Sequence, residues 1–365
     1  MTQLAEILHP EKPSDFKLSY DLPMQMSLFP RFRYMGSKFR LLEWMYSILQ
    51  DLPFDNAMDA FSGSGAVSYM FKTMGKRVIT NDSLHFPYVL SQALIQNNST
   101  RLSNEDLDSL LSARATSMEE QFIQKTFSGI FYTQDDLVFL DNIWVGLRKL
   151  TSPAKRYLAL AALLRSCIKR QPRGVFTVSG IGATYDDGRR DLRLSLREHF
   201  LEQTAEYNAA VFSNGKQNAA YHGDVFFHDK SHVDLVYMDP PYVPRSDDNC
   251  YMKRYHFLEG LSCYWRGMEI MGSSKVKKIR KPHTPFGHRG EAIQAFDRMF
   301  RQFSDSILVL SYSSNAYPDL DCLTHLMGKY KKSVNVLRKP HRYHFGTHSA
   351  AKRNLVEEYL IIGSE

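Results

Sequence analysis

The stretch from residue 56 to residue 82 constrains the fold most, because strand and helix patterns alternate within it. Residues 56–61 form a short apolar run that ends at a glycine turn, residues 66–74 show helical spacing, and residues 77–80 are rich in β-forming side chains. A strand, a helix and a second strand in this order predict a parallel βαβ unit. We therefore expect an open α/β sheet with helices on both faces.

This unit is interrupted soon after its second strand. The next comparable run, residues 233–238, leads into Asp239, which lies 239 − 82 = 157 positions after Asp82. Such a gap is too long for an ordinary crossover between strands. A second, mainly helical domain is therefore expected inside the sheet domain. Later strand patterns lie at residues 307–310, 334–337 and 355–362.

The charge of the chain is positive and unevenly spread. The 365 residues include 46 Lys and Arg against 39 Asp and Glu, which gives a net charge of +7. Residues 105–141 are acidic, whereas residues 151–200 hold ten Lys or Arg against four acids. The basic stretch favours a nucleic-acid or other anionic partner.

Several classes of protein are disfavoured by the sequence. The four cysteines, at positions 167, 250, 263 and 322, include no Cys-x-x-Cys pair, so neither a zinc knuckle nor a disulfide framework is indicated. The longest apolar run, residues 157–164, is far shorter than the roughly 20 residues of a membrane helix. The first residues show no secretory signal. We expect a cytoplasmic protein with reduced thiols and no membrane partner.

The loop from Asp59 to Gly65 is the first candidate for ligand binding. Gly63 and Gly65 allow a sharp turn between strand and helix, and the helix N-terminus offers free N–H groups. A purely structural glycine turn is the alternative. Asp82 ends the next strand, where a carboxylate accepts hydrogen bonds from ribose hydroxyls, but Ser68 stands where a nicotinamide enzyme has a third glycine. The pattern predicts a nucleoside cofactor.

The second candidate is Asp239-Pro240-Pro241-Tyr242, which follows an apolar strand. Two prolines stiffen the chain, so the Asp239 carboxylate and the Pro240 carbonyl present acceptors in a fixed geometry. Together they suit the two N–H hydrogens of a planar exocyclic amine, with Tyr242 stacked on its ring. The alternative is a turn that ends a strand, with Tyr242 packed in the core.

As an ordered set, these motifs resemble the D12 class of N6-adenine DNA methyltransferases, which includes Dam and uses S-adenosylmethionine. Further segments match the α group of that class in order, and Tyr34 replaces a tryptophan of Dam. They are Tyr34-Met35-Gly36-Ser37-Lys38, Asn81-Asp82 and Gly223-Asp224-Val225-Phe226. Two C-terminal segments, Ser311-Tyr312-Ser313 and Arg342-Tyr343-His344-Phe345-Gly346, resemble segments of restriction–modification relatives. The segment around 245–288 is longer than in Dam, so the resemblance does not imply a target sequence.

The resemblance implies a Rossmann-like class I methyltransferase sheet and assigns roles to residues. S-adenosylmethionine would be bound by Tyr34, Lys38, Asp59, Phe61, Gly63, Gly65, Asp82, Asp224, Val225 and Asp239. The target base would be bound and activated by Asp239, Pro240, Pro241 and Tyr242. No metal is implied, and the product of the cofactor would be S-adenosylhomocysteine.

The resemblance also implies a division of the chain. We expect an irregular extension over residues 1–30, a cofactor-binding catalytic domain over 31–99 and 215–365, an inserted DNA target-recognition domain over 100–214, and a candidate additional DNA-contacting insertion over 245–290. DNA contacts are expected from Lys169, Arg170, Gln171, Arg173, Lys277 and Lys278. The alternative for these side chains is a solvated basic surface.

The expected function is that of a site-specific DNA adenine-N6 methyltransferase that acts on an adenine flipped out of double-stranded DNA. It would be the modification enzyme of a bacterial or phage restriction–modification system, a monomer or dimer without a stable complex with its cognate endonuclease. Two alternatives stay open. One is an RNA or cytosine-N4 amino methyltransferase of the same fold, and the other is a catalytically silent DNA-binding specificity or regulatory protein.

Overall fold

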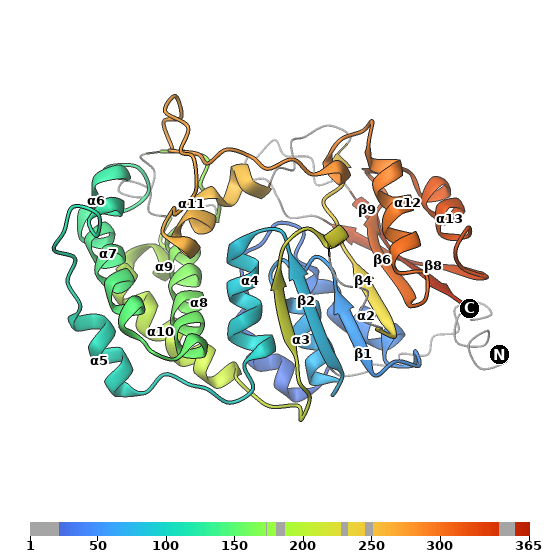
Figure 1. Cartoon of the computed structure of the whole chain (residues 1–365), viewed down its shortest axis with the longest axis horizontal. Coiled ribbons are helices and arrows are strands. Elements are labelled where there is room, and N and C mark those ends of the chain that lie inside the picture. The colour runs from blue at the N-terminus through green and yellow to red at the C-terminus, as the bar shows by residue number, and fades with distance from the viewer. Residues whose placement is uncertain (1–21, 173, 180–186, 228–232, 245–250, 343–354) are drawn as a thin grey trace.

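The computed structural model of the chain describes residues 22–365 apart from residues 173, 180–186, 228–232, 245–250 and 343–354. Within these residues, seven strands form one sheet and two short strands pair separately (Figure 1). The strands of the sheet are β1 (Asn56–Asp59), β2 (Arg77–Asp82), β3 (Ala219–His222), β4 (Leu235–Met238), β6 (Ile307–Ser313), β8 (Ser333–Arg342) and β9 (Leu355–Ser364). The separate pair is β5 (Val243–Pro244) and β7 (Ala316–Tyr317).

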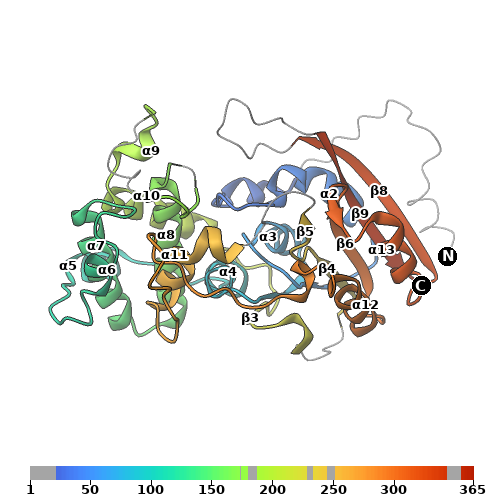
Figure 2. The same ribbon diagram turned by 90° about the horizontal axis from the view of Figure 1, so that it is seen from above.

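Helices cover the sheet and build the inserted domain (Figure 2). Those packed near the sheet are α2 (Leu42–Leu49), α3 (Ala66–Thr73), α4 (His85–Ser91), α12 (Ala292–Gln302) and α13 (Leu320–Met327). Between β2 and β3 lie α5 (Asn104–Ser112), α6 (Phe122–Thr126), α7 (Gln134–Lys149), α8 (Pro153–Arg170), α9 (Arg190–Arg193) and α10 (Leu196–Ala210), and α11 (Tyr251–Cys263) follows β5. Short turns are η1 (Met24–Leu28), η2 (Lys38–Leu41), η3 (Gln92–Gln96), η4 (Val225–Phe227) and η5 (Pro285–Gly287).

The strand order β3-β2-β1-β4-β6-β9-β8 is that of a doubly wound sheet. The first five strands run parallel, whereas β9 is antiparallel to β6 and β8 is antiparallel to β9. The chain moves outward from β1 to β3 and then crosses to β4 on the other side of β1. Ligands of such sheets bind beyond the carboxyl ends of the strands at this switch point. The predicted α/β fold with a parallel βαβ unit is confirmed.

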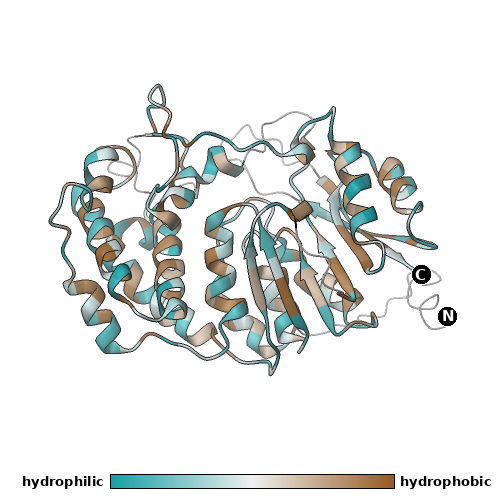
Figure 3. Cartoon of the chain, viewed as in Figure 1, coloured by the Kyte–Doolittle hydropathy of each residue, from teal (hydrophilic) through white to brown (hydrophobic). Residues whose placement is uncertain are grey.

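Successive residues of a strand point to opposite faces of the sheet. In the central strands both kinds of residue are buried, since helices cover both faces. On β4, Leu235 and Tyr237 face the core that includes α2, α3 and α4, whereas Val236 and Met238 pack in the core of α12 and α13. The outer side of α12 is hydrophilic (Figure 3). The buried strand ends at Met238, and the polar side chain of Asp239 follows directly after it.

The inserted domain is a bundle of helices at one end of the sheet (Figures 1 and 2). At its centre is α8, which packs against α4, α7, α10 and α11. Ser152 begins this helix, since its Oγ accepts a hydrogen bond from Lys155 N at 3.4 Å and Pro153 occupies the first turn. The expected helical insertion between two strands is confirmed.

The segment after the Asp-Pro-Pro-Tyr motif returns to this helical domain. Within it, Phe257 of α11 lies edge-on to Phe127 and stacks on Phe176, with ring centroids 5.0 and 5.1 Å apart respectively. Trp265 packs directly on Gly260, where a Cβ atom would lie 2.1 Å from the indole ring. Only glycine permits this approach. The segment that follows the Asp-Pro-Pro-Tyr motif thus packs against the inserted domain through α11.

Only residues 22–30 of the expected irregular extension are described by the structure, and they include a regular turn; residues 1–21 lie outside the described residues. Within residues 22–30, η1 forms a 3₁₀ turn, and Met26 and Phe29 are buried. Gln25 Nε2 donates to Tyr69 Oη at 3.0 Å, which ties the turn to α3. The sequence showed no regular period here because one turn is too short to establish one. Among the residues that the structure describes, no helix is long and apolar enough to cross a membrane.

Candidate active site

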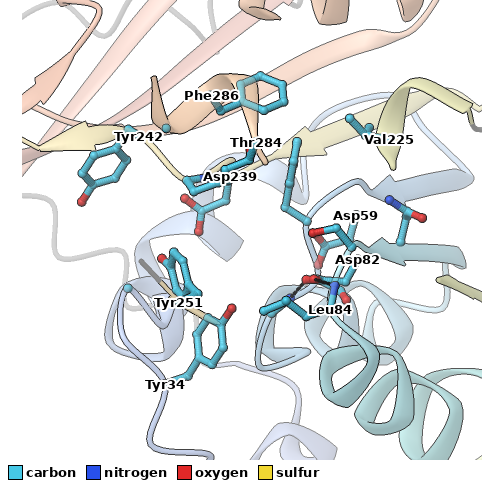
Figure 4. Close-up of a pocket in the computed structure, with 18 of the residues that line it drawn as sticks. Tyr34, Asp59, Asp82, Leu84, Val225, Asp239, Tyr242, Tyr251, Thr284 and Phe286 are labelled. Atoms are coloured by element: carbon cyan, nitrogen blue, oxygen red, sulfur yellow. Dashed lines mark hydrogen bonds between the residues drawn. The ribbon is translucent and has the colours of Figure 1, made fainter. Parts of the chain in front are cut away.

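A pocket of about 550 Å³ opens at the carboxyl ends of β1, β2 and β4 (Figure 4). Its walls come from the glycine loop after β1, the acid that ends β2, the η4 turn, the Asp-Pro-Pro-Tyr motif, the start of α11 and residues 281–287. The pocket therefore lies at the switch point where a doubly wound sheet binds its ligand.

The glycine loop is shaped by two residues with left-handed backbone. Gly63 and Gly65 have φ angles of +49° and +77°, and a Cβ on Gly63 would lie 3.0 Å from the Tyr34 ring. Other residue types are strained at such angles. The loop thus turns sharply from β1 into α3 and packs against Tyr34, as the sequence pattern predicted for the turn but not for the tyrosine.

Asp82 fixes this loop to the end of β2. Its two carboxylate oxygens accept hydrogen bonds from Gly63 N and Leu84 N, both at 2.9 Å. Burial raises the pKa of Asp82 to about 6, although these backbone bonds oppose the shift. A carboxylate has about four lone-pair positions, so acceptor capacity remains for hydroxyl groups of a ligand.

Asp59 lies at the end of β1 and is 1% exposed. Its Oδ2 accepts a hydrogen bond from Ser68 Oγ at 2.5 Å. Burial raises the pKa of Asp59 to about 7, and the nearby charges of Asp239 and Asp82 add to the shift. Ser68 thereby orients the Asp59 carboxylate. The sequence alone had used Ser68 only as an argument against a nicotinamide enzyme.

Asp239 forms an ion pair with a lysine from the N-terminal motif. Lys38 Nζ lies 3.1 Å from Asp239 Oδ1 and 3.7 Å from Glu358 Oε2. Burial raises the pKa of Asp239 to about 6, Lys38 opposes the shift and Glu358 adds to it. The structure thus brings together Lys38, expected at the cofactor, and Asp239, expected at the target base.

Aromatic rings line the side of the pocket below Asp239 in Figure 4. Tyr34 packs against both Tyr251 and Tyr255 of α11, with ring centroids 5.2 and 5.3 Å away and interplanar angles of 23° and 6°, and the two α11 rings lie 6.5 Å from each other. Tyr242 is half-buried and meets Tyr312 edge-on at 5.5 Å. Sequence reasoning missed Tyr251, because no motif surrounds it.

The opposite wall is apolar. Phe286 stacks on Phe226 at 5.6 Å and meets Phe61 edge-on at 5.4 Å, and Val225 is buried beside them. Asp224 Oδ1 accepts from Phe226 N at 3.0 Å, which holds the η4 turn. The predicted residues Phe61, Asp224 and Val225 therefore line the pocket. Phe286 was missed, although the preceding proline marks a turn.

Three carboxylates with raised pKa values surround one pocket. Burial is the main cause for Asp59, Asp82 and Asp239, because desolvation disfavours the charged form. A positively charged ligand would favour the ionised carboxylates. S-adenosylmethionine carries a sulfonium and an ammonium group, so the residues present fit this cofactor.

The basic residues of the inserted domain are largely engaged within it. Lys169 Nζ lies 3.4 Å from Asp191 Oδ1, and Arg170 Nε lies 3.3 Å from Asp136 Oδ2. Gln171 is 5% exposed, and its Nε2 donates to a backbone carbonyl. The expectation that Arg170 and Gln171 contact DNA is therefore corrected. Their side chains are hydrogen-bonded inside the domain and contribute to its packing. Arg173 and residues 343–346 lie outside the described residues.

A basic hairpin directly precedes the segment 281–287 that lines the pocket. Residues 270–279 form it, closed by an antiparallel bridge between Ile270 and Ile279 and by a hydrogen bond from Met271 N to Lys278 O at 2.8 Å. Figure 1 shows this segment projecting above α11 and continuing along the top of the sheet. It leads through Lys281 into the pocket wall.

Comparisons with known proteins agree with this arrangement. A family model described as D12 class N6 adenine-specific DNA methyltransferase matches residues 34–311. The Type II methyltransferase M2.HphI of Haemophilus parahaemolyticus is 32% identical over 86% of this chain and 92% of its own length. M.CviAII of Paramecium bursaria Chlorella virus 1 is 25% identical over 90% and 97%, and M.FokI of Planomicrobium okeanokoites is 27% identical over 77% and 44%. As the motifs from Tyr34 to Tyr242 predicted, the chain belongs to the D12 class of N6 adenine-specific DNA methyltransferases.

Proposed function

We propose that this chain transfers a methyl group from S-adenosylmethionine to N6 of an adenine flipped out of double-stranded DNA, as the site-specific modification enzyme of a restriction–modification system. The carrying observation is the ion pair between Lys38 and Asp239, because it joins the cofactor motif to the catalytic motif in one pocket. Relatives named Type II methyltransferases and modification methylases support this role. We further propose a monomer or dimer without a stable complex with a cognate endonuclease.

S-adenosylmethionine supplies a methyl group on a positively charged sulfur. Asp82 would accept from the ribose, the loop 61–65 and Tyr34 would hold the methionine end, and Val225 with Phe286 would cover the adenine. The buried carboxylates around the pocket would favour this cation over S-adenosylhomocysteine, whose sulfur is neutral. No metal is part of the proposal.

The target amine would be held by Asp239 and the carbonyl of Pro240. Both accept N–H hydrogens, which directs the nitrogen lone pair toward the methyl group. Flipping the base out of the duplex costs a few kcal/mol. Stacking on aromatic rings returns roughly 1 to 3 kcal/mol per base. Tyr242 is the proposed platform, and the reaction then depends on positioning in line with the methyl donor.

The DNA would lie across the pocket mouth and the hairpin 270–279. Lys275, Lys277 and Lys278 have no acidic partner within ion-pair distance in the part of the chain that the structure describes. Free ammonium groups suit phosphates, which fix the position of a duplex without reading its sequence. Lys277 and Lys278 thus stay in the proposal, and Lys169 stays as a secondary contact because Asp191 already pairs with it.

Transfer of labelled methyl groups to a varied DNA library tests this function. Asp239→Ala should lower the transfer rate by at least about a hundredfold, since it removes an acceptor aimed at the reacting amine, while DNA affinity changes little. Asp297→Ala is the matched control, because this carboxylate lies on the surface of α12 and pairs with Lys329 at 3.1 Å. The control should methylate at the wild-type rate.

Digestion of the product to nucleosides identifies the methylated base. N6-methyladenine supports the proposal, whereas N4-methylcytosine or label found only in RNA would replace it with an enzyme of another specificity. A wild-type protein that binds DNA, gains no thermal stability from the cofactor and transfers no label would be a DNA-binding protein without catalysis. At 100 times its dissociation constant a bound cofactor adds about 2.7 kcal/mol to stability.

A further inference from the structure

Glu358 is a buried carboxylate on β9 that belongs to none of the motifs discussed so far. Its side chain is 1% exposed, and Oε2 lies 3.7 Å from Lys38 Nζ. The residue pairs across the sheet with Ser313 of β6 and Lys339 of β8. Its neighbour Glu357 points to the other face, where its carboxylate is 46% exposed and lies 3.7 Å from Arg338.

Lys38 is held between two carboxylates on different elements. Its side chain is 5% exposed, with Asp239 Oδ1 at 3.1 Å on one side and Glu358 on the other. An ammonium on a four-carbon stem is mobile unless its position is fixed from more than one direction. Glu358, a buried residue of β9, holds the Lys38 ammonium from the second side.

We propose that Glu358 is a positioning residue for methyl transfer, which holds Lys38 against Oδ1 of Asp239 and so leaves Oδ2 for the amino group of the target base. The carboxylate of Asp239 then has one oxygen occupied and one presented in a fixed direction. This inference rests on the proposed function, because it assigns Glu358 a part in the same reaction.

The charge of Glu358 affects the pKa of Asp239, so the proposed role can be tested through the pH dependence of activity. Ionisable groups that interact electrostatically with Asp239 lie on several elements. They are Tyr34 before η2, Lys38 in η2, Asp59 on β1, Tyr237 on β4, Tyr251 on α11 and Glu358 on β9, and of these Lys38 and Glu358 shift the pKa of Asp239. Glu358 raises the pKa of Asp239 by repulsion, whereas Lys38 lowers it. Asp239 must be ionised to accept the amine hydrogens, so activity rises as the pH passes its pKa.

Steady-state kinetics of Glu358→Gln as a function of pH test the inference. This variant keeps the shape of the side chain and removes its charge. We expect kcat to fall about tenfold or more because Lys38 is less firmly placed, with little change in the KM values for DNA and cofactor. The acid limb of the pH profile should move to lower pH, since the repulsive charge of Glu358 is gone while Lys38 still lies next to Asp239.

Two further variants separate positioning from structure. Glu358→Asp keeps the charge and shortens the reach, so it should lower kcat while the acid limb stays in place. Glu357→Gln is the control on the same strand, and we expect wild-type kinetics from it.

Three results would overturn the role of Glu358. They are wild-type kinetics in Glu358→Gln, wild-type kcat in Glu358→Asp, and a loss of kcat that is matched by equal losses of melting temperature and cofactor affinity with an unmoved acid limb. A wild-type enzyme that fails to methylate DNA would instead contradict the proposed function itself.

Discussion

Lys72 of α3 is a buried lysine that holds two carbonyl groups where the chain leaves the sheet for the inserted domain. Its Nζ donates to Leu94 O and Asn97 O, both at 2.8 Å, and lies 4.8 Å from the centre of the Phe212 ring. Burial lowers the pKa of Lys72 to about 7, whereas its ordinary value is 10.5. Folding therefore weakens the hold of this amine on its proton.

Lys72→Met should flatten the pH dependence of stability. In the wild type, the unfolded chain binds more protons at this site than the folded one between pH 7 and 10.5, so stability rises with pH across that window. The variant lacks this rise. Urea unfolding at a series of pH values measures it, with Lys216→Met, an exposed lysine, as the control that should follow the wild type. Parallel curves for wild type and Lys72→Met would contradict the assignment.

At the scale of elements, α4 depends on α11 for its N-terminal cap. The residue before α4, Leu84, offers no side-chain cap, and the first two N–H groups, of His85 and Phe86, donate to Glu259 at 2.8 and 3.1 Å. Glu259 lies in α11 and is 4% exposed. The cap therefore connects the segment after the Asp-Pro-Pro-Tyr motif to the end of β2, next to Asp82.

Glu259→Ala should lower the free energy of unfolding by about 1 to 3 kcal/mol, because it leaves buried N–H groups without an acceptor. It should also weaken cofactor binding, since Leu84 lines the pocket. Glu198 in the capping box of α10 is the comparison: it is exposed, so water can replace it. Glu198→Ala should cost less stability and leave cofactor affinity unchanged. Equal effects of the two substitutions on both quantities would refute the link between α11 and the pocket.

The elements that the sequence predicted are those with a local signal. β1 and β4 are buried on both faces and therefore read as apolar runs. β3 was missed, because it lies at the edge of the sheet and its burial pattern is mostly exposed or intermediate. The hairpin 270–279 was not predicted as an element and was only included in the candidate insertion over 245–290, since a single bridge leaves no alternation in the sequence.

The residues of the candidate site likewise differ in whether the sequence around them carries a local signal. Gly63, Asp82 and Asp239 were predicted because each sits at a turn or strand end with its own pattern. Tyr251 and Glu358 were missed, since Tyr251 lines the pocket through the packing of α11 and Glu358 reaches Lys38 through the register of β9. Tertiary contacts bring them to the site, and neither residue has a local motif that would reveal this.

At the scale of the whole molecule, the charge of the inserted domain is mostly compensated within the domain. The acidic and basic stretches pair with each other, as Asp106 does with Lys155 at 2.7 Å and Asp136 with Arg170 at 3.3 Å. Paired charges contribute little to attraction of a polyanion. The net charge of +7 is therefore expected to attract DNA mainly where lysines lack such partners, and the hairpin that precedes the pocket segment 281–287 is such a place.

The double substitution Lys277→Ala with Lys278→Ala should weaken DNA binding and make its salt dependence shallower. Each phosphate contact contributes about 0.9 to the slope of log K against log salt concentration, so the slope should fall by roughly 1 to 2. The control is Lys216→Ala with Lys332→Ala, which removes two lysines that lie shortly before β3 and β8, the two outer strands of the sheet, at the strand ends opposite the pocket; Lys332 pairs with Glu365 at 3.2 Å. Binding measured at several salt concentrations should leave the control slope unchanged, because those lysines face away from the pocket mouth. If both doubles lowered the slope equally, the hairpin would contribute only to the overall field, and the duplex would have to be placed elsewhere on the molecule.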